Sequence, residues 1–83
     1  MNAQEQLTEL EALAGKLDVQ ICYESMSGLV QGIGGLCRVK GQYRIIIDKR
    51  LKPPERIQIV ADALRKFEFS TDELSPQIRK LLV

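Results

Sequence analysis

The sequence contains no histidine and no tryptophan, and it contains only two cysteines. Without imidazole there is no histidine general base, no serine–histidine or cysteine–histidine nucleophile pair and no histidine metal ligand. Cys22 and Cys37 form no CxxC pair, and disulfide-stapled small domains usually carry about four or more cysteines. Arg38 lies next to Cys37, but nothing completes a catalytic set. We therefore expect two partly buried free thiols in a reducing compartment.

Long hydrophobic runs are also missing. Strictly apolar stretches are no longer than Ile45-Ile46-Ile47, whereas a membrane-spanning helix needs about 20 apolar residues. The polar, acidic residues 1–6 lack the positive start and apolar run of a secretory signal. These absences predict a cytoplasmic protein with no membrane partner.

Neither sign of charge is in excess, because 12 Lys and Arg residues stand against 11 Asp and Glu residues. The chain as a whole thus lacks the basic signature of a nucleic-acid-binding protein. Its 83 residues predict a single domain, 1–83, with one small core.

Hydrophobic periodicity divides the chain into six elements. Residues 3–17 carry one apolar stripe at helical spacing behind a predicted Asn2–Glu5 capping box. Residues 18–24 alternate as a half-buried strand, and residues 36–48 read as a hairpin. Helices follow after Pro53-Pro54 and after Ser75.

This order, α-β-β-β-α-α, predicts an α+β fold. We expect a three-stranded antiparallel sheet with the two main helices on one face and a short C-terminal helix. The covered face would carry a set of alternating apolar residues. They are Val19, Ile21, Tyr23, Ile45 and Ile47.

The register of the hairpin follows from an argument about burial. A three-residue loop, residues 40–42, would place Arg38 opposite Arg44 on the outer side and leave Cys37, Val39 and Tyr43 inside. A two-residue turn at Gly41-Gln42 would mix charged and apolar residues on both faces. Because burying a charge is costly, we predict the three-residue loop.

The neutral total hides a charge asymmetry, since residues 1–24 carry a net charge of −4 and residues 38–56 carry +5. Arg38, Lys40, Arg44 and Lys49 are therefore candidate anion-binding residues. In the predicted register Arg38 and Arg44 repel one another, and an anion would relieve that repulsion. The alternative is a solvated sheet face whose charges prevent aggregation. Nucleic acid is the less favoured anion, because no aromatic residue is available for stacking on that face.

The glycine-rich segment 25–35 matches neither GxxxxGK[ST] nor the dinucleotide GxGxxG, and a strand follows it instead of a helix. Its apolar residues, together with a second apolar stripe on the helix after Pro54, suggest contact with a protein partner or a second copy. The candidate contact residues are Leu29, Val30, Ile33, Ile59 and Ala63.

The run from Gly35 to Asp48, followed by Arg56 to Arg65, resembles the core of zinc-dependent peptidases of the ImmA/IrrE type, over roughly residues 35–67. In that family a hairpin with an isoleucine-rich strand precedes an arginine-led helix bearing HExxH. The resemblance would place the zinc histidines at Ala61 and Arg65 and the catalytic glutamate at Asp62. None of the three is retained, which implies a metal-free remnant of the scaffold. The layout is also similar to that of small bacterial proteins without an assigned function.

The sequence therefore predicts a non-enzymatic interaction module that needs no cofactor and no metal. The main alternative is anion or nucleic-acid binding through the basic hairpin. A third possibility is an enzyme that uses Asp48, Asp62 or Cys37, since a buried carboxylate with a raised pKa can act as a base.

Overall fold

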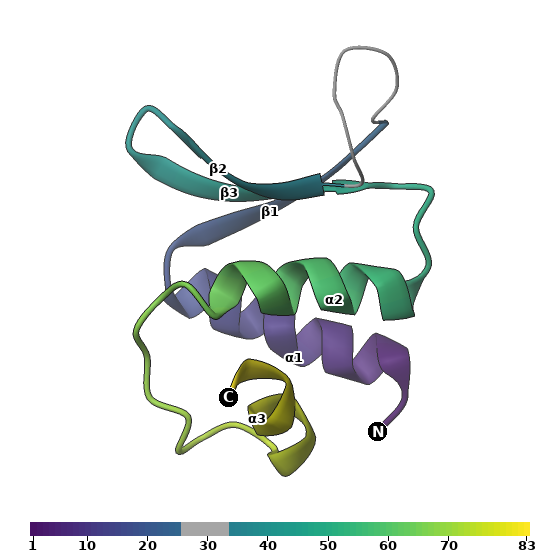
Figure 1. The fold of residues 1–83 in the computed structure, drawn as a ribbon, viewed down its shortest axis with the longest axis vertical. Coiled ribbons are helices and arrows are strands. Elements are labelled where there is room, and N and C mark those ends of the chain that lie inside the picture. The colour runs from purple at the N-terminus through teal and green to yellow at the C-terminus, as the bar shows by residue number, and fades with distance from the viewer. Residues whose placement is uncertain (26–33) are drawn as a thin grey trace.

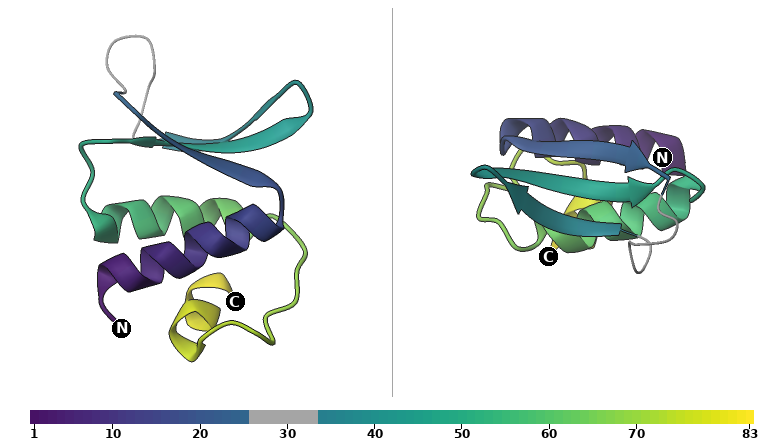
Figure 2. Two further views of the ribbon diagram at one scale, coloured as in Figure 1. Left: turned by 180° about the vertical axis from the view of Figure 1, so that it is seen from behind. Right: turned by 90° about the horizontal axis from the view of Figure 1, so that it is seen from above.

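A computed structural model describes residues 1–25 and 34–83 of the chain. Its elements are α1 (Ala3–Lys16), β1 (Val19–Glu24), β2 (Gly34–Val39), β3 (Gln42–Asp48), α2 (Pro53–Leu64) and α3 (Pro76–Leu82). The predicted α+β class and element order are confirmed. Figure 1 shows three layers: the sheet, the pair α1 and α2, and α3 on the side of that pair away from the sheet. Both main helices lie on one face of the sheet, as predicted (Figure 2).

Short-range capping explains where α1 and α3 begin. The side-chain oxygen of Asn2 accepts a hydrogen bond from the Glu5 N–H at 2.8 Å, and the Ser75 hydroxyl accepts one from the Ile78 N–H at 3.4 Å. Each bond satisfies a backbone donor that has no partner within the helix. The chain leaves α1 through Asp18, whose φ of 60° turns it into β1.

The sheet is mixed, so the prediction of three antiparallel strands is wrong. Its strand order is β1-β3-β2, with β1 parallel and β2 antiparallel to β3. The prediction assumed that all three strands are antiparallel, whereas only β2 and β3 are. In the structure β3, which contains Ile45-Ile46-Ile47, takes the centre, where both of its edges are hydrogen-bonded.

The predicted hairpin register is also wrong. The turn has two residues, Lys40 and Gly41, with φ angles of 52° and 84°, which is the left-handed geometry of a type I′ turn. Arg38 consequently pairs with Tyr43, and Arg44 pairs with Cys37. Arg38 is on the same side as the helices, yet it stays exposed and lies over the Tyr43 ring at 5.4 Å. The burial cost that motivated the prediction therefore does not arise.

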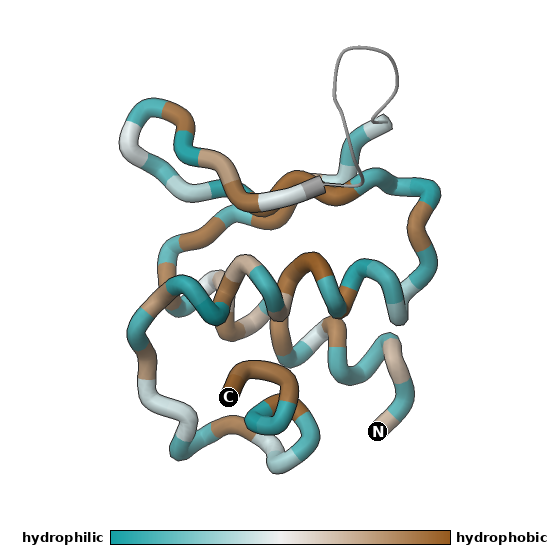
Figure 3. Tube along the Cα trace, in the orientation of Figure 1, coloured by the Kyte–Doolittle hydropathy of each residue, from teal (hydrophilic) through white to brown (hydrophobic). Residues whose placement is uncertain are grey.

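The hydrophobic core lies between the sheet and the helices and continues to α3. Figure 3 shows hydrophobic residues recurring along α1, along α2 and at the centre of the sheet. Of the predicted covered face, Val19, Ile45 and Ile47 are buried, and Ile21 packs against them. Tyr23 is on the same face but 37% exposed. The largest fully buried side chains are Leu7, Leu10, Ile45, Ile47, Val60, Leu64 and Ile78.

Candidate functional site

The side of the sheet that points away from the helices is the candidate site, and we refer to it as the outer face. Side chains alternate between the two sides of a strand, so the burial of Ile45 and Ile47 assigns their neighbours to the outer face. By strand register the outer face carries Gln20, Cys22, Glu24, Gly35, Cys37, Val39, Gln42, Arg44, Ile46 and Asp48.

The centre of the outer face is apolar. Ile46 on β3 lies between Cys22 on β1 and Gly35 on β2, and both Ile46 and Cys22 are only partly buried. A Cβ atom added at Gly35 would meet nothing within 4 Å, so space beside Ile46 is open. Farther along β2, Val39 is 40% exposed.

All-parallel sheets are normally covered on both faces, whereas antiparallel sheets can leave one face in water, and this mixed sheet contains one strand pair of each kind. Here α1, α2 and α3 all lie below the sheet, and seen from above the three strands stand in front of the helices (Figure 2, right). Within residues 1–25 and 34–83, no helix or strand covers the outer face. In the part of the chain that the structure describes, the sheet therefore presents a partly apolar surface that no helix or strand covers.

Arg44 is the polar residue at the middle of this surface. It lies between Gln20 and Cys37 and is partly buried. Its Nε atom is buried without a hydrogen-bond partner. A buried donor without an acceptor loses the hydrogen bonds that water would supply, which costs about 1–3 kcal/mol.

The four candidate anion-binding residues are not brought together. Arg38 and Arg44 project from opposite faces of the sheet. Lys40 is in the turn and Lys49 follows the other end of β3, so the two are roughly 25 Å apart at about 3.3 Å per residue. No single anion can contact all four side chains.

The partner-contact residues predicted on the second helix are part of the core. Ile59 is 8% exposed and Ala63 is 3% exposed, and α2 contacts the sheet, α1 and α3. The wide apolar stripe of α2 is accounted for by packing within the chain, so these two side chains offer no free surface. Leu29, Val30 and Ile33 lie outside the described residues.

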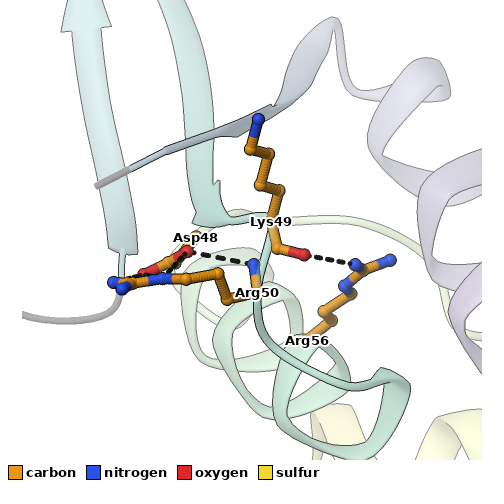
Figure 4. A network of polar contacts seen from close by, with 4 residues as sticks. All are labelled: Asp48, Lys49, Arg50 and Arg56. Atoms are coloured by element: carbon orange, nitrogen blue, oxygen red, sulfur yellow. Dashed lines mark hydrogen bonds and ion pairs between the residues drawn. The ribbon is translucent and has the colours of Figure 1, made fainter. Parts of the chain in front are cut away.

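A cluster of polar contacts lies in the connector between β3 and α2 (Figure 4). The Asp48 carboxylate accepts hydrogen bonds from the Arg50 backbone N–H and from Arg50 Nε, both at 3.0 Å, and from Arg50 Nη2. These bonds lower the pKa of Asp48 from 3.8 to about 2. A carboxylate with so low a pKa is a weak general base, and near neutral pH it carries no proton to donate as an acid.

Arg56 fastens the same connector to α2. Its guanidinium donates to the Leu51 carbonyl at 2.8 Å and to the Lys49 carbonyl at 3.0 Å, and it lies 4.7 Å from the Tyr23 ring centroid. The Tyr23 hydroxyl donates to the Glu11 carboxylate on α1. Burial and this hydrogen bond raise the pKa of Tyr23 to about 12. Sequence reasoning missed this link between α1, β1 and α2, because its members are far apart in the chain.

α2 begins without free amides for an anion. Pro53 and Pro54 have no N–H, and the Lys52 N–H donates to the Glu55 carboxylate at 3.1 Å. The connector is basic, but its polar groups bind one another. These hydrogen bonds hold the connector in place, so its role is structural.

The positions implied by the peptidase resemblance do not form a site. Ala61 is buried in the core, while Asp62 and Arg65 pair with one another on the exposed side of α2. Arg65 also donates to the Leu81 carbonyl at 2.6 Å, which ties α2 to α3. Among the described residues, no three or more Cys, Asp or Glu side chains cluster as a metal would require.

A shallow depression of about 360 Å³ lies between α1 and residues 69–74. Lys16 and Glu73 form an exposed ion pair at its rim. Neither of the two cysteines lines it. Its lining offers no chemistry beyond that of an ordinary surface.

Comparisons of the chain with protein-family models, with curated proteins and with solved structures found no match. Among the described helices, none is long and apolar enough to cross a membrane.

Proposed function

We propose that this chain is a non-enzymatic interaction module that binds protein through the outer face of its sheet. One observation carries the proposal: among the described residues, α1, α2 and α3 lie on one side of the sheet, and half-buried Ile46, Cys22 and Cys37 lie on the other. A protein partner would supply the missing layer.

This proposal moves the contact surface away from the second helix and keeps the partner class predicted from the sequence. A metal-free remnant of a peptidase scaffold remains compatible with it, because Ala61 and Arg65 offer no zinc ligands. An enzyme built on Asp48, Asp62 or Cys37 is not favoured. Asp48 is bound by Arg50 and Asp62 by Arg65, while no described base approaches Cys37 within hydrogen-bond reach.

The test compares two lysine substitutions with a matched control in the full chain. Ile46→Lys introduces a charge at the centre of the outer face, and Val39→Lys introduces one at a more exposed position that should not affect folding. Gln58→Lys adds the same charge on the exposed side of α2. Circular dichroism and thermal unfolding would verify that each variant folds.

The amount of protein that the chain captures, including further copies of the same chain, should fall for the two outer-face variants. It should stay unchanged for Gln58→Lys. Equal capture by all variants would contradict the proposal. Binding of a labelled oligonucleotide at low salt that survives Ile46→Lys and weakens steeply with salt would instead support the anion-binding alternative.

A further inference from the structure

We infer that the outer face binds a second copy of this chain as a two-fold symmetric dimer, in which Arg44 of each copy pairs with Glu24 of the other. The inference rests on the proposed function and names its partner. It follows from the charges on the outer face, which are complementary to themselves.

Both charges are on the same surface but cannot meet within one copy. Arg44 is level with Gln20 on β1, whereas Glu24 lies at the other end of β1, level with Asp48. The two levels are about 13 Å apart along the strands, at about 3.3 Å per residue. Within the described residues neither Arg44 nor Glu24 has an ion pair. Asp48 is engaged by Arg50, which leaves Glu24 as the exposed acceptor on the face.

Symmetry decides how two such faces can stack. In the aligned class of sheet packing the strands of the two sheets run in roughly the same direction, so a two-fold axis between the sheets runs either along the strands or across them. An axis along β3 would place Arg44 over Arg44 of the second copy, which is repulsive. An axis across the strands at the level of Ile46 keeps each strand over itself, so Arg44 lies over Asp48 of the second copy, and Glu24 of that copy lies one strand to the side, about 4.8 Å away. Only the second arrangement brings opposite charges together, and it does so twice.

The same axis also pairs the apolar centre with itself. Ile46 lies midway between the levels of Arg44 and Asp48, so it faces Ile46 of the second copy. Cys22 is level with Ile46 and therefore faces Cys22 of the second copy. The open space beside Gly35 leaves room for the opposing side chains.

The size of the face predicts a weak dimer. Three strands about 4.8 Å apart and about 20 Å long cover roughly 300 Å² of projected area on each copy. This is well below the ~800 Å² per partner of a standard stable interface. We therefore expect association that depends on protein concentration and on salt.

Sedimentation of the full chain up to about 1 mM, where Kd corresponds to about −4.1 kcal/mol, tests the dimer directly. Arg44→Glu and Glu24→Arg should each raise the dissociation constant at least about tenfold, because each removes both symmetric pairs. The double variant, with both charges exchanged, should restore dimerisation to within a fewfold of the original. A strictly monomeric chain, or a double variant no better than the single ones, would overturn the inference.

Cross-linking gives a second readout that does not depend on affinity alone. A short bismaleimide should join two copies through Cys22, so Cys22→Ser should abolish the covalent dimer. Cys37→Ser should retain it, since Cys37 is level with Arg44 and the two Cys37 residues of a dimer would be about 13 Å apart along the strands. Cross-linking through Cys37 alone would contradict the proposed axis.

The failure of the dimer can be told apart from the failure of the proposed function. If the chain is monomeric but captures another protein in a manner sensitive to Ile46→Lys, only the second copy is excluded. If neither self-association nor capture responds to Ile46→Lys, the outer face is not a binding surface and both proposals fail.

Discussion

Tyr23 shows how one side chain can join three elements. Its ring carries the Arg56 guanidinium, and its hydroxyl bonds Glu11 on α1. Burial and the hydrogen bond to Glu11 favour the neutral phenol and outweigh the opposing effect of the Arg56 charge, so the pKa of Tyr23 rises to about 12 from its usual 10. The folded state therefore loses stability as the pH rises through this range, since Tyr23 ionises more readily in the unfolded chain.

We expect Tyr23→Phe to lower the free energy of unfolding by about 1 kcal/mol near pH 7, the typical contribution of one hydrogen bond. Below pH 10 the ionisation of Tyr23 should not change the difference in the free energy of unfolding between the original chain and the variant. Between pH 10 and about 12 this difference should shrink as the tyrosine ionises. Urea unfolding at pH 7, 10 and 11.5 would measure it. Tyr43 is unchanged in both proteins and serves as the internal control. A difference that stays the same up to pH 11.5 would show that the hydroxyl does not bond Glu11.

At the scale of elements, the Lys40-Gly41 turn determines which side chains reach the outer face. Both residues have positive φ, which glycine adopts freely and lysine adopts at a cost. Asparagine followed by glycine is the preferred pair for this turn type. Lys40 is thus less favourable at the first turn position than asparagine would be.

Two substitutions in the turn should have opposite effects. Lys40→Asn should raise the free energy of unfolding by a few tenths of a kcal/mol up to about 1 kcal/mol, because asparagine tolerates the left-handed region. Gly41→Ala should lower it by about 1 kcal/mol for the same backbone reason, since a Cβ there meets no other atom. Thermal unfolding of both variants would measure the change. If Gly41→Ala were neutral, the turn would not have the two-residue geometry.

The elements were predictable from the sequence where local signals define them. Asn2, Ser75 and Pro53 mark the helix starts, and the alternation after Asp18 marks β1. The hairpin was located correctly, but its register was not, because the burial argument assumed that every residue on the inner side is covered. Arg38 lies beside Tyr43 near the end of the sheet, where a charge remains in water.

For the whole molecule, the sequence does not indicate which strands pair or which helix covers which stripe. The parallel pairing of β1 with β3 leaves no local trace, since either pairing puts Val19 and Ile21 on the covered face. The second apolar stripe of α2, which contains Ile59 and Ala63, gives the same sequence pattern whether α3 or a partner covers it. The outer face was missed for the same reason. Ile45 and Ile46 are adjacent, so they point to opposite faces of the sheet. Which of the two faces is covered becomes known only once the helices have been placed.

Ile45 and Ile46 are adjacent and chemically identical, so they provide a matched test of this layered arrangement. Ile45 is fully buried under the helices, and Ile46 is half-buried on the outer face. Ile45→Val should lower the free energy of unfolding by about 1 kcal/mol, within the 0.5–1.5 kcal/mol typical of a core position. Ile46→Val should cost less than half of that at micromolar concentration, where we expect the chain to be monomeric. Urea unfolding of both variants would measure the two values, and equal losses would show that a second layer covers Ile46 within one copy.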